Sequence, residues 1–329
     1  MKKRLIALLV PLALVLLCAA GGAAAAGEGL PDEAYLTEDA LTIAFDESVP
    51  LGASPGAVGW EPTVAYGTVT YRGGGSCPAT IDASNLADGY VRVSCNAGAG
   101  ARLKVLITGP DKVRYTYNLK NDGTYETFPL SAGSGSYKIG VYKNISGTSY
   151  STLYTKTVRA ELKDEFAPFL RPNQYVNYTA GCNTVAKAAE LTAGMTDELQ
   201  KVAAIYDYVV HNVSYDMRKA ATVQSGYLPD VDTILETRKG ICFDYAALMA
   251  AMLRSQGVPT KLVVGYAGEV YHAWLTVYTE ETGWVEAVVF FDGSTWKRMD
   301  PTFASTGRES KRIIDYINDP ANYQQKFLY

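Results

Sequence analysis

The hydrophobic pattern of the sequence changes near residue 163, and this change divides the chain into two differently built halves. Before this point, short apolar alternations are separated by turn residues, as is typical of strands. After residue 180, apolar residues recur first at helical spacing and then in alternation. A chain of 329 residues, 48% apolar and 19% charged, has the length and composition of about two globular domains. We therefore expect an all-β half followed by an α+β half.

The first half contains four clear strand candidates, at residues 102–108, 112–118, 137–143 and 153–162. Gly109-Pro110-Asp111 and Asn121-Asp122-Gly123 supply turns. Strands at this spacing favour an antiparallel β-sandwich of immunoglobulin-like type, which we assign to residues 27–162. Within that range, residues 31–75 show no regular pattern.

Residues 1–26 have the layout of an export signal. Residues 1–4 form a basic segment with three cations, residues 5–17 are apolar, and the alanines at 23–26 offer a cleavage site. A retained membrane anchor is the alternative, but the apolar run is shorter than a spanning helix requires. Leu17 stands before Cys18, where lipid attachment requires a small residue, so we expect no lipoprotein anchor. We predict a secreted, cell-wall or surface-exposed protein with no membrane contact apart from this signal.

The charge balance argues against a nucleic-acid partner. The formal net charge is −4, and loss of the three cations in the export signal would take it to −7. Nucleic-acid binding requires a basic surface, which this composition does not favour.

Two cysteines of the first half, Cys77 and Cys95, are 18 residues apart in the sequence. Disulfides form and persist in exported proteins, so we expect these two residues to be bridged. A loop of this size would stabilise the fold by roughly 3 kcal/mol. Buried free thiols are the alternative.

The second half begins after residues 163–179, a stretch with two prolines and four aromatics that we expect to be an ordered linker. In residues 180–329, Thr196 caps a predicted helix with an apolar stripe from Leu199 to Val210. Asp232 caps a short helix, and Cys242 opens a third that ends at Gly257. Strands follow at residues 261–266, 270–278, 284–291 and 296–300. This order predicts helices packed on an antiparallel sheet.

Cys242, His272 and Asp300 form the candidate catalytic set. Cys242 begins a helix, where the dipole and free N–H groups favour a thiolate. His272 lies on the strand face opposite the apolar residues Ala273 and Leu275. Asp300 ends a strand before a proline and could orient the imidazole. The arrangement is typical of nucleophilic acyl transfer.

A structural role competes with the catalytic one at this set of positions. Cys242 could be a small buried residue or a disulfide partner of Cys182. Asp292 is the rival acid, although the Asp-Gly step of a hairpin already accounts for it. His211, the only other histidine, has no partner in the pattern and is expected to be a surface residue.

The sequence resembles the transglutaminase-like superfamily, and its bacterial secreted members in particular. The resemblance covers residues 180–306 and is carried by these blocks in order: Gly240-Ile-Cys242-Phe-Asp-Tyr-Ala246, Leu253-Arg-Ser-Gln-Gly257-Val-Pro259, Gly265-Tyr266, His272-Ala-Trp274, Gly283-Trp284 and Met299-Asp300-Pro-Thr302. It implies a papain-like cysteine fold with a Cys-His-Asp triad at Cys242, His272 and Asp300. Residues 287–297 depart from the family pattern, and we expect an extra hairpin there.

The resemblance also suggests supporting residues. Tyr215 resembles a family position at which a side chain donates to the oxyanion, although a core aromatic is an equal alternative. Tyr266 and Trp274 flank the base and could form a wall of the cleft, with simple packing as the alternative. We expect no metal and no cofactor, because the sequence has no metal motif and no glycine-rich phosphate loop.

The predicted function is that of a secreted thiol enzyme acting on peptide or protein amides through a Cys thioester, with hydrolysis favoured over amine transfer. Its partner would be a peptide or protein substrate, which could be associated with the cell wall. The alternative is a module that binds the cell wall or a host surface and carries a vestigial triad.

Overall fold

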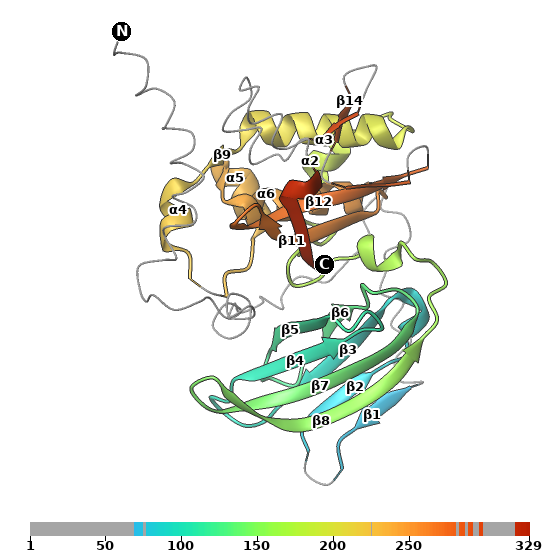
Figure 1. Cartoon of the computed structure of the whole chain (residues 1–329), viewed down its shortest axis with the longest axis vertical. Coiled ribbons are helices and arrows are strands. Elements are labelled where there is room, and N and C mark those ends of the chain that lie inside the picture. The colour runs from blue at the N-terminus through green and yellow to red at the C-terminus, as the bar shows by residue number, and fades with distance from the viewer. Residues whose placement is uncertain are drawn as a thin grey trace.

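The computed structural model describes residues 69–74, 77–224, 226–280, 283–286, 289–291, 296–298 and 320–329. Along the chain, an all-β part is followed by a group of helices and then by a second β part (Figure 1). The predicted export signal, Cys18, Asp292 and Asp300 lie outside the described residues.

The all-β part consists of two four-stranded antiparallel sheets, with strand orders β1-β2-β3-β6 and β5-β4-β7-β8. The strands are β1 (Thr70–Arg72), β2 (Ala79–Asp82), β3 (Tyr90–Cys95), β4 (Leu103–Thr108), β5 (Arg114–Leu119), β6 (Glu126–Pro129), β7 (Gly135–Ser146) and β8 (Ser149–Ala160).

Alternation along these strands explains their burial. In β4, Leu103, Val105 and Ile107 point to one side and are buried, as are Tyr137 and Ile139 of β7. Residues from both sheets belong to one buried cluster. The four predicted strands correspond to β4, β5, β7 and β8. Strands β1, β2 and β6 went unpredicted because they have only three or four residues, and β3 was missed although it is as long as β4. The immunoglobulin-like type of this region stays a prediction.

The predicted disulfide is not formed in this structure, in which Cys77 and Cys95 are both free thiols. The Cys77 Sγ instead donates a hydrogen bond to the Leu153 carbonyl oxygen at 3.4 Å. Cys95 is fully buried in β3. Burial raises the pKa of the Cys95 thiol to about 11, and the neighbouring Cys77 adds to the shift. A thiol held in its protonated form reacts poorly in disulfide exchange.

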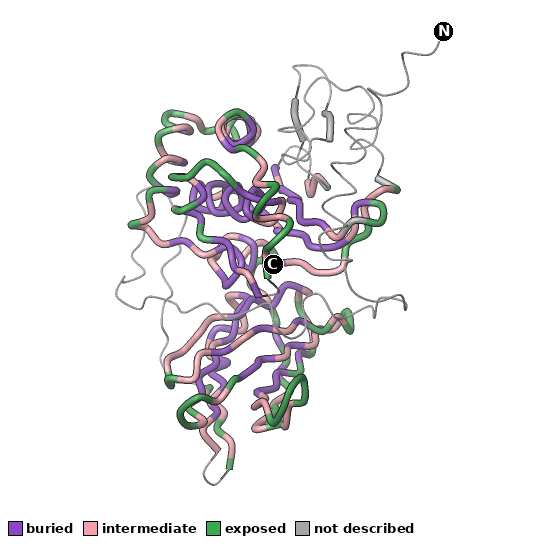
Figure 2. The backbone as a smooth tube through the Cα atoms, turned by 90° about the vertical axis from the view of Figure 1, so that its left-hand side faces the viewer, coloured by how far each residue is buried: buried purple, intermediate pink, exposed green. Residues whose placement is uncertain are grey.

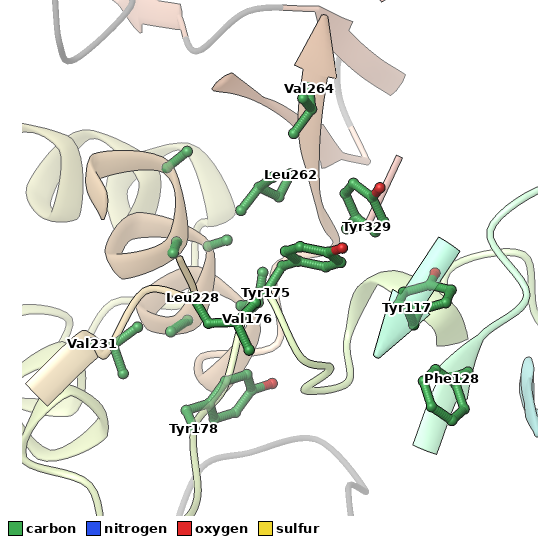
Figure 3. Packing of buried hydrophobic residues seen from close by; sticks show 14 of the residues in the cluster. Tyr117, Phe128, Tyr175, Val176, Tyr178, Leu228, Val231, Leu262, Val264 and Tyr329 are labelled. Atoms are coloured by element: carbon green, nitrogen blue, oxygen red, sulfur yellow. The ribbon is translucent and has the colours of Figure 1, made fainter. Parts of the chain in front are cut away.

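The segment between the halves contains a short 3₁₀ helix, Ala167–Phe169, and is otherwise irregular. Tyr175 in this segment is fully buried. Its ring lies 4.1 Å from that of Tyr329 and 6.0 Å from that of Tyr117 in β5, measured between centroids. Figure 3 shows these rings side by side. The segment therefore packs against both halves of the molecule.

Five helices follow among the described residues: α2 (Asn183–Leu191), α3 (Glu198–Asn212), α4 (Met217–Thr222), α5 (Val231–Thr237) and α6 (Cys242–Ser255). Two predicted caps shift by a residue or two. Asp197, not Thr196, caps α3 by accepting from the Gln200 N–H at 3.0 Å. Asp230, not Asp232, caps α5.

The second β part is an antiparallel sheet of order β13-β12-β11-β16. Its strands are β11 (Thr260–Ala267), β12 (Val270–Thr279), β13 (Gly283–Glu286) and β16 (Tyr323–Leu328). Helix α6 lies at the centre of this half, in contact with α2, α3 and α5 as well as with β11 and β12. The burial view shows it within the buried interior (Figure 2).

The extra hairpin predicted at residues 287–297 is confirmed: β14 (Val289–Phe291) and β15 (Trp296–Arg298) pair with each other antiparallel in a separate two-stranded sheet. The single strand predicted at residues 284–291 corresponds to two strands, β13 and β14. In the structure β16 occupies the edge next to β11. No helix in the described part of the chain is long and apolar enough to span a membrane.

Candidate active site

Cys242 stands where a buried helix reaches the surface. From Asp244 to Ser255 every residue of α6 is buried, whereas Cys242 and Phe243 are half-buried. A helix that is apolar on all sides belongs in a core, and its first turn is the part that a substrate can reach. The first N–H groups of a helix lack partners within it, so this turn favours an anionic sulfur or oxyanion.

His272 lies on β12, the strand on which α6 packs. It is 6% exposed and pairs with Gly265 of β11. Its ring stacks on that of Trp274 at 6.2 Å between centroids, with an interplanar angle of 21°. The imidazole and the indole therefore lie side by side on one face of β12.

Tyr271 connects the cysteine and the histidine strand. Burial raises the pKa of its hydroxyl, and the nearby Tyr175, Tyr266 and Cys242 raise it further. Cys242 and Tyr271 pack against the same buried cluster, which contains Ala273 and Leu275 of β12. His272 lies on the other face of β12, beside Trp274.

Tyr215 lies beside the residues that lead into Cys242. It belongs to β9 (Ser214–Tyr215), which runs parallel to β10 (Lys239–Gly240) and places Tyr215 opposite Gly240. The Asp216 N–H donates to the Gly240 carbonyl at 2.9 Å. Tyr215 is half-buried and packs against the core. Its role as an oxyanion donor remains a prediction.

The two predicted wall residues differ in exposure. Trp274 is 4% exposed and packs under β16, with its ring 5.3 Å from that of Tyr323. Tyr266 is half-buried and meets Tyr271 edge-on at 5.4 Å. Their roles as cleft walls are untested, but Trp274 has the burial of a core residue.

His211 is exposed at the end of α3, 2.9 Å from the Asp207 carboxylate.

The candidate acids both follow strands of the small β14-β15 sheet. Phe291 pairs with Trp296, so Asp292 falls in the connection between these strands, and Asp300 comes two residues after β15 ends. Both aspartates lie outside the described residues, so the assignment of the third member of the triad stays a prediction.

Sequence reasoning missed Asp244, which is fully buried two residues after Cys242. Its carboxylate accepts from the Ile241 N–H at 2.8 Å, from Lys219 and from Tyr227. An acid at the third position of a helix is a known capping signal. That signal could have identified the cap, but not the two partners from a distant segment.

In the family comparison, residues 185–301 match the model described as Transglutaminase-like superfamily. The kyphoscoliosis peptidase of Homo sapiens is 34% identical over 145 residues, covering 39% of this chain and 22% of that protein. The protein-glutamine gamma-glutamyltransferase of Pseudomonas aeruginosa is 30% identical over 115 residues, covering 30% and 17%. The chain therefore spans less than a quarter of either curated relative.

The solved structure of a candidate cysteine protease from Cytophaga hutchinsonii overlaps 70% of each chain, with a TM-score of 0.35 and 16% identity. The match places a transglutaminase-like domain in the second half of this chain, and the described helices and antiparallel sheet of that half form an α+β fold. Cys242 and His272 both lie within the matched residues.

Proposed function

We propose that this chain is an exported thiol enzyme that acts on amide groups of peptides or proteins, with Cys242 as the nucleophile. One observation carries the proposal. Cys242 is the half-buried first residue of an otherwise buried helix, and that helix packs on the strand of His272. Thiol acyl transfer uses a nucleophilic thiol with an imidazole as its base, a helix N-terminus favours the thiolate, and His272 is the base that we propose.

In the proposed reaction, His272 takes the proton from the Cys242 thiol, and the sulfur attacks the amide carbonyl carbon. The tetrahedral intermediate collapses to a thioester as the C–N bond breaks and the leaving amine receives the proton from His272. Water or a primary amine, deprotonated by His272, then attacks the thioester and restores the thiol. Asp300 would hold the imidazole in the correct tautomer, and the Cys242 N–H would donate to the oxyanion.

The names of the relatives support this chemical class. One is a peptidase and the other a protein-glutamine gamma-glutamyltransferase, so both names describe chemistry at amide groups of proteins. Between the two outcomes we favour hydrolysis. Water is present at about 55 M, so transfer requires a cleft that excludes water and holds an amine in near-attack geometry.

Export and surface location are part of the proposal and rest on the layout of residues 1–26. We further propose that the two N-terminal sheets form an immunoglobulin-like sandwich that presents the catalytic domain to a wall-associated or surface-associated protein substrate.

Turnover of a defined acyl donor tests the proposal. The protein is incubated with a library of glutamine-containing peptides and a labelled primary amine, and released ammonia, cleaved peptide and incorporated label are measured. We expect deamidated or cleaved product in excess of label, and no product of any kind with Cys242→Ala.

Cys182→Ala is the matched control, because Cys182 also lies half-buried at the start of a helix, α2. Its Sγ accepts a hydrogen bond from the Thr179 N–H at 3.3 Å. We expect this variant to keep full turnover. Label in excess of hydrolysis would favour transfer, and turnover that survives Cys242→Ala would contradict the proposal. Absence of all turnover would favour the binding module with a vestigial triad.

A further inference from the structure

A buried charged cluster lies directly behind Cys242 in the structure. The Asp244 carboxylate is fully buried, and the ammonium of Lys219 lies 2.6 Å from its Oδ2. The Tyr227 hydroxyl donates to Oδ1 at 2.5 Å and accepts from the Lys219 ammonium at 2.6 Å. The Lys219 ammonium also lies 4.0 Å from the centre of the Tyr227 ring. The three side chains are thus mutually bonded.

The partners of Asp244 come from a segment that we call the strap, residues 214–228, which contains β9 and α4. The beginning of the strap is attached to the residues before Cys242: the Ser214 N–H donates to the Arg238 carbonyl and the Asp216 N–H to the Gly240 carbonyl, both at 2.9 Å. The Asp216 side chain also caps α4. Lys219 and Tyr227 attach the rest of the strap to Asp244.

Asp244 also holds the backbone that leads into Cys242. Its Oδ2 accepts from the Ile241 N–H at 2.8 Å, so one carboxylate joins the strap and the residue before the nucleophile. Gly240 allows the close approach, because a Cβ at this position would lie 2.5 Å from the Asp244 Cβ. The same carboxylate therefore fixes the lead-in of Cys242 and the strap that carries Tyr215.

A structural role alone explains this cluster poorly. Burying a carboxylate and an ammonium costs solvation energy that their attraction repays only in part, and apolar residues of similar volume often stabilise a fold as well or better. A helix cap can be made by an exposed acid, as Asp197 does for α3. What a buried and fully bonded carboxylate does provide is a fixed geometry.

We propose that Asp244 is a positioning residue for the thiol chemistry: through Ile241, Lys219 and Tyr227 it holds the Cys242 N–H and the Tyr215 strand where they face the carbonyl under attack. The inference rests on the proposed function of Cys242. Asp244 would thus contribute to the reaction without touching either the substrate or the Cys242 sulfur.

Two reactions of the same sulfur separate positioning from folding. Alkylation of Cys242 by iodoacetamide needs the exposed sulfur but no oxyanion donor, whereas acylation by p-nitrophenyl acetate needs both. In Asp244→Asn we expect kcat for the ester to fall by about 10- to 100-fold, with KM and the alkylation rate of Cys242 close to wild type. In Tyr227→Phe, which removes one hydroxyl, we expect a smaller fall in the same direction.

Asp232→Asn is the matched control. The Asp232 carboxylate also holds a helix start, since it accepts from the N–H groups of Asn183 and Thr184 in α2 at 2.9 and 2.8 Å. We expect this variant to keep the wild-type ratio of ester turnover to alkylation, even where its thermal stability is reduced.

The possible outcomes distinguish this inference from the function on which it rests. If Asp244→Asn keeps ester turnover within about twofold of wild type, the positioning role alone is overturned. It is also overturned if turnover and alkylation fall in parallel in Asp244→Asn and Tyr227→Phe. Wild-type protein whose Cys242 is alkylated but never acylated would overturn the enzymatic function itself, and the positioning role with it.

Discussion

At the scale of single residues, the proposed catalytic groups act on one another. The position of a residue in the sequence does not tell which role it has, but the effects of substitutions can. His272 is held against Trp274 on the strand next to α6. An acid that orients the imidazole contributes to the rate, whereas an acid in a hairpin turn contributes to local stability.

We expect Asp300→Ala to lower kcat by roughly 1,000-fold or more with little effect on unfolding, since its proposed task is to orient His272. Asp292→Ala should leave kcat nearly unchanged and lower the melting temperature slightly, because Asp292 lies between β14 and β15. Kinetics and thermal unfolding of both variants provide the check. If the effects of the two variants are exchanged, Asp292 is the catalytic acid.

The thiols of the N-terminal sheets give a second prediction at this scale. Burial raises the pKa of the Cys95 thiol to about 11, so at pH 8 this residue is protonated and inaccessible. In native protein under non-reducing conditions, iodoacetamide should modify the half-buried Cys77 and spare Cys95 until denaturant is added. Peptide mapping that finds the two cysteines bridged would restore the disulfide predicted from the sequence.

The sequence predicted Cys242 and His272 because local signals mark both: a glycine before a helical apolar pattern for the cysteine, and strand alternation for the histidine. It could not predict the bonding of Asp244, since Lys219 and Tyr227 reach this residue through tertiary packing of the strap. Local patterns indicate whether a residue belongs to a helix or a strand. They do not indicate which distant segment bonds to its side chain.

At the scale of elements, the sheet that carries His272 depends on a close approach at Gly265. A Cβ at this position would lie 2.0 Å from the Gln324 carbonyl oxygen of β16 and 2.9 Å from the Trp274 ring. The register between β11 and β16 shifts at this point, between Val264 and Gly265. Because residue 265 is a glycine, β16 can pack closely against β11, at the position of β11 that pairs with His272.

We expect Gly265→Ala to lower the free energy of unfolding by about 1–3 kcal/mol, because backbone atoms of β16 would have to move. Gly181→Ala is the control, since a Cβ there would meet only the Thr179 Oγ1 at 3.9 Å. Urea unfolding of both variants measures the difference. Equal stability of the two would show that β16 is not packed on β11 as described.

Most longer elements follow from the sequence, but the errors have physical causes. Asp232 was assigned as the cap of its own helix, whereas its carboxylate caps α2 through space. One strand was predicted at residues 284–291, whereas the structure has β13 in the main sheet and β14 in the two-stranded sheet with β15. Strand β16 was missed, because its polar residues Gln324, Gln325 and Lys326 are consecutive and do not alternate with apolar ones.

At the scale of the whole molecule, the fully buried Arg254 joins three parts of the chain. From α6 its guanidinium donates to the carbonyl oxygens of Thr260 at 2.8 Å, Arg171 at 2.7 Å and Tyr329. Burial lowers the pKa of this group to about 10. One side chain thus joins α6 to β11, to the segment between the halves and to Tyr329 after β16. None of these bonds is visible in the sequence pattern.

We expect Arg254→Met to lower the free energy of unfolding by about 3 kcal/mol, because the carbonyls of Thr260, Arg171 and Tyr329 each lose a hydrogen bond from the guanidinium, although the Tyr329 oxygen keeps the Leu262 N–H as a donor. Arg159→Met should change it by less than about 0.5 kcal/mol, since its bond to Glu161 is exposed to solvent. Chemical denaturation of both variants is the measurement. A small effect for Arg254→Met would indicate that water or other donors replace the guanidinium.

The central claim is that Cys242 is a nucleophile activated by His272, and thiol labelling tests it without knowledge of the substrate. Labelling rates of Cys242 and Cys182 with iodoacetamide are compared near pH 6 by peptide mass spectrometry, in wild type and in His272→Ala. Activation by His272 predicts that Cys242 reacts at least about tenfold faster than Cys182 in wild type and loses this advantage in His272→Ala. Equal rates for the two cysteines in wild type, or an advantage of Cys242 that persists without His272, would contradict it.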